Sequence, residues 1–126
     1  MQRSNFYSYT QKKLDLLTKN LLVIKRDGRV VKFDADKIYK AIEKAVNSVF
    51  GEKHSININN IVDNVIIEIG NRFKDNIKIY ELQNIVEHTL ITLGEEAIYE
   101  EYVGYRSMRD IERERSLDIN VAIEKL

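Results

Sequence analysis

The chain of 126 residues has no cysteine, only two histidines and no long apolar run. Without cysteine it cannot form disulfides, thiolate metal sites or a zinc ribbon, and it has no cysteine nucleophile. His54 and His88 are far apart in the sequence, so a metal site would depend mainly on carboxylates, and no such site is indicated. The apolar runs are far shorter than a membrane span, and the chain does not open with a secretory signal pattern. These absences predict a cytoplasmic protein with no membrane segment.

The chain also lacks an excess of either charge, because 20 Lys and Arg residues balance 20 Asp and Glu residues. The placement is uneven: residues 21–50 hold seven basic and four acidic side chains, whereas residues 81–106 hold one Arg and six Glu. A nucleic acid usually needs an extended basic face, so a local positive cluster favours a small anionic ligand. The G-x-x-x-x-G-K-[ST] loop is absent, so hydrolysis of ATP is not expected.

The length and the apolar fraction of 44% predict one domain with a hydrophobic core. Its most informative stretch is LLVIKRDGRVVKFDADKIYK, from Leu21 to Lys40. Two apolar runs flank Asp27-Gly28, the dipeptide typical of a two-residue hairpin turn, and predict a β-hairpin. Asp34 then has the short polar side chain of an N-cap, and apolar residues follow at helical spacing.

The predicted first helix ends at Gly51, and a polar loop follows it. Apolar residues from Ile61 onward recur with a helical period. They predict a second helix that Asn59 or Asn60 caps and that runs to about Phe73.

A short alternating segment from Ile77 to Ile79 can add a third strand beside the hairpin. A third helix is expected to begin near Tyr80 or Glu81 and to bury an apolar face that includes Leu93, before Gly94 ends it.

The chain is expected to begin with a terminal arm or a short helix from about Thr10 to Lys19, and a fourth helix begins at Glu95-Glu96. The fold class is therefore α+β, a small bundle of about four helices capped by a β-hairpin or a three-stranded sheet. The apolar side of the fourth helix is predicted to consist of Ala97, Ile98, Tyr102, Tyr105 and Met108 or Arg109.

A helix start beside a basic hairpin predicts a binding site for an anion. Backbone N–H groups at a helix N-terminus carry partial positive charge, and Lys25, Arg26 and Arg29 lie in the adjacent hairpin. This combination suits a polyphosphate in particular.

Three blocks of the sequence, LLVIKRDGRVVKFDADKI, YELQNIVEHTLITLG and YEEYVGYR, together resemble the ATP-cone, the nucleotide-sensing regulatory module of ribonucleotide reductases. The likeness extends from about Leu21 to Arg109. The related repressors of reductase genes carry a cysteine-rich zinc ribbon, which this chain lacks. The segments YRSMRDIERERS and DINVAIEKL resemble instead the exit from the cone into the catalytic barrel of the anaerobic, glycyl-radical reductases.

The resemblance implies a truncated N-terminal region of an anaerobic ribonucleoside-triphosphate reductase. Residues 1–20 would be the arm, residues 21–106 the cone, and residues 107–126 a linker and the start of a catalytic domain. The cone would bind ATP as activator and dATP as inhibitor, with Mg²⁺, and would perform no chemistry itself. Its partners would be the catalytic domain of the same polypeptide and other copies in a ligand-dependent homo-oligomer. The alternative is a helical domain that binds a protein or a nucleic acid through the basic hairpin.

The resemblance also implies contacts for the phosphates. Lys25 and Arg26 match the Lys-Arg pair that meets the triphosphate, and charge-assisted contacts suit phosphate oxygens. Lys37 matches a lysine in the first helical turn, where a nearby anion would offset an unfavourable helix dipole. Arg106 is likewise assigned to the phosphates.

The remaining implied contacts concern the base and the sugar. Val23, Val31 and Phe33 would supply strand surface against the purine, although plain core packing explains them equally well. Gln83 would lie near the ribose or phosphates. Ile79 departs from the family pattern, since many members have Thr or Ser there as an N-cap, and Val31 replaces an acidic residue of some members. Tyr102 and Tyr105 are assigned to the core.

Overall fold

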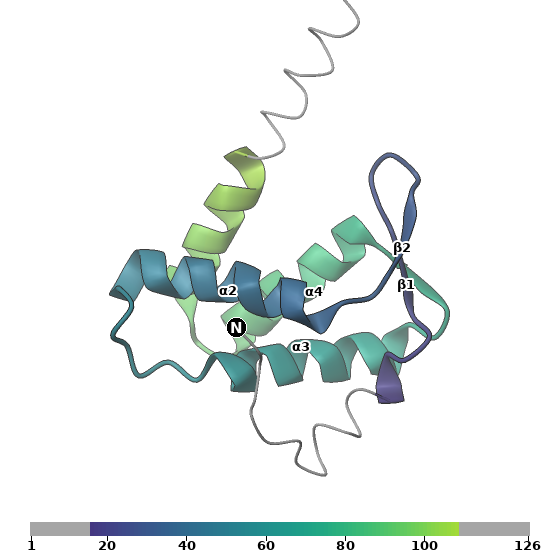
Figure 1. Cartoon of the computed structure of the whole chain (residues 1–126). Coiled ribbons are helices and arrows are strands. Elements are labelled where there is room, and N and C mark those ends of the chain that lie inside the picture. Colours follow the sequence, from purple (N-terminus) through teal and green to yellow (C-terminus); the bar gives the residue numbers. More distant parts are fainter. Residues whose placement is uncertain (1–15, 109–126) are drawn as a thin grey trace, which may run out of the picture.

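Three short strands form a mixed sheet at one end of a group of helices (Figure 1). The computed structural model describes residues 16–108. Strand β1 (Leu22–Ile24) is central, with β2 (Val30–Lys32) antiparallel on one side and β3 (Asn76–Lys78) parallel on the other. Val23 pairs with Val31 and with Ile77, so these three apolar side chains share the face that covers the core. The predicted α+β fold and its third strand are confirmed.

The hairpin turn is longer than predicted. The Lys25 N–H donates to the Arg29 carbonyl at 2.8 Å, and the Gly28 N–H donates to the Lys25 carbonyl at 3.0 Å. Three residues therefore lie between the paired ends, in a type I turn followed by Gly28 with φ of 88°. A two-residue type I′ turn needs positive φ at both central residues, and Asp27 does not adopt it.

Helix α2 (Ala35–Phe50) begins and ends where the sequence predicts. The Asp34 carboxylate accepts a hydrogen bond from the Asp36 N–H at 3.0 Å, and Gly51 follows the helix with φ of 77°. The cap satisfies one of the N–H groups that a helix start leaves unpaired. Only Phe33 and Asp34 separate the end of strand β2 from the start of this helix.

Helix α3 (Ile58–Arg72) begins earlier than predicted. Asn57, rather than Asn59 or Asn60, is its N-cap, and its side-chain oxygen accepts from the Asn60 N–H at 3.1 Å. Ile58 is buried in the first turn, so the apolar face of the helix starts three residues before Ile61.

Helix α4 (Ile79–Thr92) also begins slightly early, directly after β3. The Lys78 N–H donates to the Glu81 carboxylate at 3.0 Å, which compensates in part for the lack of a Ser or Thr cap. At the other end, the Gly94 N–H reaches the Ile91 carbonyl at 3.0 Å. Leu93 was expected on the buried face but is 37% exposed, because it follows the last helical residue.

The last described helix covers residues 96–108 and leaves the bundle at its far end (Figure 1). Ile98 and Tyr102 are buried as predicted, but Tyr105 and Met108 are 38% and 63% exposed. The assignment of Tyr105 to the core is therefore wrong, since only the first half of the helix lies over the core. The Lys44 ammonium donates to the Tyr105 hydroxyl at 2.8 Å instead. Ala97 is exposed too, while Tyr99 and Val103 pack partly against the core.

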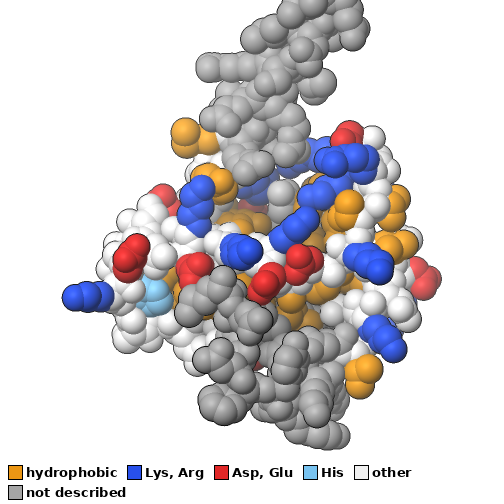
Figure 2. All heavy atoms as spheres, viewed as in Figure 1, with side chains coloured by type: hydrophobic (Ala, Val, Ile, Leu, Met, Phe, Trp, Pro, Cys, Tyr) orange, Lys and Arg blue, Asp and Glu red, His pale blue; other side chains and the backbone are white. Residues whose placement is uncertain are grey.

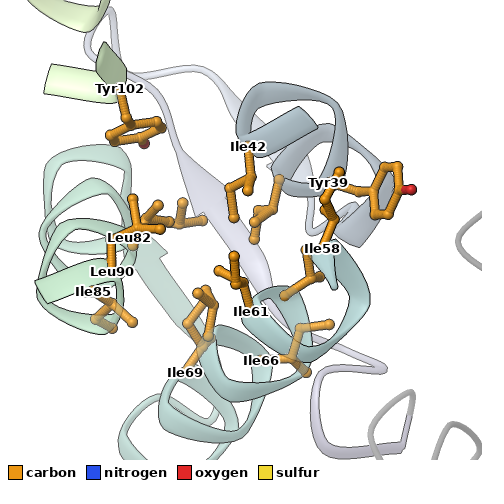
Figure 3. Close-up of a cluster of buried hydrophobic side chains, with 14 of the residues drawn as sticks. Tyr39, Ile42, Ile58, Ile61, Ile66, Ile69, Leu82, Ile85, Leu90 and Tyr102 are labelled. Atoms are coloured by element: carbon orange, nitrogen blue, oxygen red, sulfur yellow. The ribbon is translucent and has the colours of Figure 1, made fainter. Parts of the chain in front are cut away.

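The hydrophobic core lies between α2, α3, α4 and the first half of the 96–108 helix. Figure 3 shows side chains from these elements gathered in one cluster, with Ile42 and Ile61 in its middle and Tyr102 above Leu82. Each fully buried aliphatic side chain contributes about 1.5–3 kcal/mol relative to exposure. Within residues 16–108, no helix has both the length and the apolar character needed to cross a bilayer. The side chains with no exposed surface are Ile42, Val46, Val62, Val65, Ile69, Ile77, Leu90 and Ile98.

The segment ahead of the sheet packs against α3 through a glycine. A Cβ atom added at Gly70 would lie 2.7 Å from the Leu17 Cβ, which is closer than side chains approach one another. Most of the short helix expected from Thr10 to Lys19 lies outside the described residues, and residues 16–17 are helical. Gly70 therefore provides the space in which Leu17 and the end of the arm dock.

We predict opposite effects for alanine at two helical glycines. Gly104→Ala meets nothing within 4 Å, so it should raise the free energy of unfolding by about 0.5–1 kcal/mol through better helix propensity. Gly70→Ala should lower it by about 1 kcal/mol or more, because overpacking against Leu17 outweighs the same gain. Urea denaturation of both variants measures the difference. Equal stabilisation by the two substitutions would show that Leu17 does not pack as described.

Candidate functional site

Two adjoining hollows lie between the hairpin, the start of α2, α4 and the 96–108 helix. One has a volume of about 160 Å³ and the other about 320 Å³. Small-molecule sites commonly occupy roughly 300–1,000 Å³, so the two together are large enough for a ligand. Figure 2 shows Lys and Arg side chains gathered over the hairpin and the neighbouring helix, around a recess in which hydrophobic side chains are visible.

The smaller hollow is mainly apolar, whereas four of the ten residues that line the larger one are basic. Phe33, Ile38, Leu82 and Val86 line the smaller one, which we call the apolar hollow. Arg26, Arg29 and Arg106 line the larger one, which we call the cationic hollow. Five residues line both, and they mark the junction. They are Lys25, Ala41, Ile79, Gln83 and Tyr102.

All seven predicted binding residues line one or both hollows. The apolar hollow includes Val23, Val31 and Lys37, and the cationic hollow includes Arg26 and Arg106. Lys25 and Gln83 lie at the junction. The structure thus brings the predicted residues together, while their contacts with a ligand remain predictions.

The sheet places the hairpin residues of the site. Side chains alternate along a strand, so Lys25 follows Val23 on one face, and Phe33 follows Val31. Val23 is buried at 5% exposure, whereas Val31 is only partly buried. Val23 is therefore part of the core as well as of the wall of the apolar hollow, whereas Val31 has more exposed surface that a ligand could contact.

The turn reaches α4 across the cationic hollow. Arg26 Nη2 lies 3.4 Å from Gln83 Oε1 and donates a long hydrogen bond to it, although the residues are 57 positions apart in the sequence. This contact joins two predicted residues. It also holds the hairpin tip against the helix that follows β3.

Asp27 stabilises the conformation of the turn and offsets part of the positive charge of its side chains. Its carboxylate accepts from the Arg29 backbone N–H at 3.1 Å and from Arg29 Nε at 2.7 Å. These hydrogen bonds lower the pKa of Asp27, so the carboxylate stays ionised. Arg29 is thereby held along the turn by an adjacent negative charge.

Lys37 lies in the first turn of α2, exposed at the edge of the apolar hollow. A cation in this position is repelled by the positive end of the helix dipole. A bound anion would offset that repulsion, since it would interact favourably with the ammonium and with the helix N-terminus.

Arg106 is oriented by Glu87, a residue that the sequence did not single out. Arg106 Nε donates to Glu87 Oε1 at 3.0 Å, and Arg106 Nη2 makes an even closer contact with the same oxygen. The side chains are only 26% and 15% exposed. Glu87 lies one turn after Gln83 on α4, and this i,i+4 spacing is the one sequence signal that could have indicated it.

Tyr102 lies at the junction as well as in the core. Burial raises its pKa to about 12, with a further increase from Glu87 and an opposing effect from Arg106. The phenol therefore keeps its proton at physiological pH. Assignment to the core alone missed this contribution to the site.

Ile79 extends the apolar surface at the junction. The family resemblance led us to expect Thr or Ser there in many members, and this chain instead offers an aliphatic side chain to both hollows. Within residues 16–108, no three His, Asp or Glu side chains are placed to hold a metal ion.

The fold and the two hollows define a small α+β domain suited to a ligand with an apolar part and an anionic part. A family model described as the ATP cone domain matches residues 21–111 of the chain. The chain belongs to this family. The family resemblance predicted from the three sequence blocks is thereby confirmed.

Two relatives show the proteins in which similar sequences occur. The chain is 35% identical over 109 residues to an anaerobic ribonucleoside-triphosphate reductase of Haemophilus influenzae. It is 28% identical over 113 residues to a ribonucleoside-diphosphate reductase subunit alpha of Chlamydia muridarum. The alignments cover 85% and 82% of this chain but only 15% and 11% of those relatives. The similarity is thus to a small part of much longer proteins.

We predict a strong energetic coupling between Glu87 and Arg106. Removing one partner leaves the other poorly solvated, so a double-mutant cycle with Glu87→Gln and Arg106→Gln should give about 1–3 kcal/mol in the free energy of unfolding. The exposed pair Glu68–Arg72, at 3.5 Å on α3, is the control and should give about 0.3–0.5 kcal/mol. Similar coupling in both pairs would contradict the burial argument.

Proposed function

We propose that the chain is a regulatory module that binds ATP as activator and dATP as inhibitor of a ribonucleotide reductase. The observation that carries this proposal is the continuity of an apolar hollow with a cationic one. A purine needs an apolar surface, and a triphosphate needs convergent cations and N–H groups. The site offers both on one small domain, in a chain of the ATP-cone family.

The proposed pose follows from the lining of the two hollows. The purine lies in the apolar hollow, against Val23, Val31 and Phe33. The triphosphate extends toward Lys25, Arg26 and Arg106 in the cationic hollow, while Lys37 meets it from the start of α2. Gln83 then lies near the sugar or the first phosphate. Each cation contributes a charge-assisted contact to phosphate oxygens.

The module performs no chemistry in this proposal. Mg²⁺ would accompany the nucleotide through phosphate oxygens, and the carboxylates of Asp27 and Glu87 are engaged with arginines. The effect of the ligand is therefore conformational.

We further propose that the parent protein is an anaerobic ribonucleoside-triphosphate reductase. The identity of 35% to such an enzyme supports this, as do the segments after the cone that resemble the exit to its barrel. Residues 1–20 would be the arm, residues 21–106 the cone, and residues 107–126 the linker and the start of the catalytic domain. Regulation would involve that domain and a ligand-dependent homo-oligomer, in contact with the cytoplasmic nucleotide pool.

Opposite effects of ATP and dATP require two states of the parent enzyme. A ligand shifts an equilibrium only by its difference in affinity for the two states. The two nucleotides differ by one 2′-hydroxyl, so contacts near the sugar must differ between them.

We predict that isothermal titration calorimetry on the purified 126-residue chain shows binding of ATP and dATP. The affinity should lie in the micromolar range, and single-stranded oligonucleotides should bind far more weakly. The absence of heat for both nucleotides would contradict the proposal. Tight oligonucleotide binding with steep salt dependence would favour the nucleic-acid alternative instead.

The second prediction concerns the Lys-Arg pair. Lys25→Ala with Arg26→Ala should weaken the binding of both nucleotides by about 10²-fold to 10⁴-fold, since two charge-assisted contacts of about 1.5–3 kcal/mol each are lost. Lys40→Ala with Lys53→Ala removes the same charge, and neither residue lines either hollow. This control should change affinity by less than about threefold through screened, distant charge alone. Equal losses in the two double variants would refute a direct contact.

A further inference from the structure

Glu87 places a negative charge beside the cationic hollow. Its Oε1 accepts from Arg106 Nε at 3.0 Å and from Arg106 Nη2 in an even closer contact, and its side chain is only 15% exposed. Burial and then the charge of Glu87 raise the pKa of Tyr102, which lines both hollows. The electrostatic field of Glu87 therefore extends to the place where the two hollows meet.

The charge of Glu87, taken alone, opposes an anionic ligand. A carboxylate repels phosphate oxygens, and the repulsion is stronger where water is partly excluded. Glu87 also offsets the charge of Arg106, which is one of the four basic residues that line the cationic hollow. Glu87 itself lines neither hollow. Any benefit of Glu87 to ligand binding must therefore come through the arginine that it holds.

The geometry of the pair allows such a benefit. A guanidinium group has five N–H donors in a rigid plane, so it can meet a carboxylate along one edge and a phosphate with other donors. Two nitrogens of Arg106 share one oxygen of Glu87, which fixes the plane of the guanidinium. Ordering a long side chain only when the ligand arrives would weaken binding by about twofold to tenfold. The contact with Glu87 orders Arg106 beforehand.

Arg106 differs in this respect from Arg29, which lines the same hollow. The carboxylate partner of Arg29 is Asp27, two residues away in the same turn, and the side chains of that pair are 70% and 58% exposed. The partner of Arg106 comes from another helix and is mostly buried. Two packed helices therefore determine where the Arg106 guanidinium lies.

We infer that Glu87 is a positioning residue that strengthens the binding of a nucleoside triphosphate by holding Arg106 at the cationic hollow, although its own charge opposes the ligand. This inference rests on the proposed function, in which the triphosphate contacts Arg106. The repulsion is reduced because the carboxylate is paired with the guanidinium. The ligand then meets an oriented ion pair whose positive end lines the hollow, and such fixed dipoles need no reorganisation when a charge arrives.

Two substitutions at position 87 separate orientation from charge. Glu87→Met removes the negative charge and the acceptor oxygens, whereas Glu87→Gln removes the same charge but keeps an oxygen that can accept from Arg106. Calorimetry should show that Glu87→Met raises the Kd for ATP and for dATP about threefold to tenfold. The Kd of Glu87→Gln should lie between those of Glu87→Met and the unsubstituted chain. Glu100→Met is the control, since Glu100 is exposed on the 96–108 helix and lines neither hollow, and it should change either Kd by less than about twofold.

A cycle in nucleotide affinity separates positioning from support of the fold. In a chain that already carries Arg106→Met, the further change Glu87→Met should not raise the Kd by more than about twofold, because no guanidinium remains to be held. Replacing both members of a mostly buried ion pair by apolar side chains is often tolerated, so this double variant should remain folded. A loss of the same size with and without the arginine would show that Glu87 acts through the fold alone, and would overturn the inference.

Two further results would overturn the inference while leaving the proposed function intact. One is tighter nucleotide binding by Glu87→Gln or Glu87→Met, which would show that repulsion outweighs orientation. The other is unchanged affinity in both variants. Failure of the unsubstituted chain to bind either nucleotide would instead overturn the proposed function, and with it the role of Glu87.

Discussion

The pairing of β1 with a strand on each side is the constraint on which the site depends. The antiparallel partner β2 returns the chain to the start of α2, and the parallel partner β3 leads directly into α4. One strand thereby brings the N-terminal ends of two helices to the same edge of the domain. Arg26 meets Gln83 only because this pairing places the hairpin tip beside α4. A change in the register of β1 would move every hairpin cation relative to both helices.

The site brings several basic side chains close together, and carboxylates pair with two of them. Arg29 pairs with Asp27 inside the turn, and Arg106 pairs with Glu87 across two helices. The mostly buried pair with Glu87 holds the Arg106 guanidinium in position, which lowers the entropic cost of meeting an anion, whereas the Arg29–Asp27 pair is largely exposed. The exposed Lys37 lies in the first turn of α2, where the helix dipole opposes a cation; Asp34 and Asp36 lie in the same region, and a bound anion would offset the repulsion further. In the proposed function, the triphosphate supplies that missing negative charge.

Local patterns predicted most of the elements, and tertiary contacts decided the rest. Periodicity and the cap at Asp34 were enough to place α2, because both signals are local. Three asparagines, Asn57, Asn59 and Asn60, compete as caps of α3, and burial of the neighbouring Ile58 selects the first.

The binding side chains were predictable to a different extent. The hairpin cations could be identified because they lie next to one another in the sequence. Glu87 had only its i,i+4 spacing from Gln83 as a sequence signal, because its role depends on Arg106, 19 residues away on another helix. Tyr102 and Tyr105 both fit the apolar face that the sequence predicts for this helix. The core lies beneath only the first half of the helix, so Tyr102 is buried and Tyr105 is exposed.

In the proposed function, the 96–108 helix is the element through which ligand contacts would reach the rest of the reductase. Polar contacts fasten it to α2, where Ser48 donates to Glu101 at 2.7 Å, and to α4 through Arg106. Tyr102 and Arg106 lie one turn apart on this helix and line the cationic hollow from its side. In the proposed function, a triphosphate that contacts Arg106 also bears on the attachment of this helix to α4, because Arg106 is paired with Glu87 of α4. Ligands that contact Arg106 differently would then hold the helix differently, and such a difference between two states is what allosteric coupling requires.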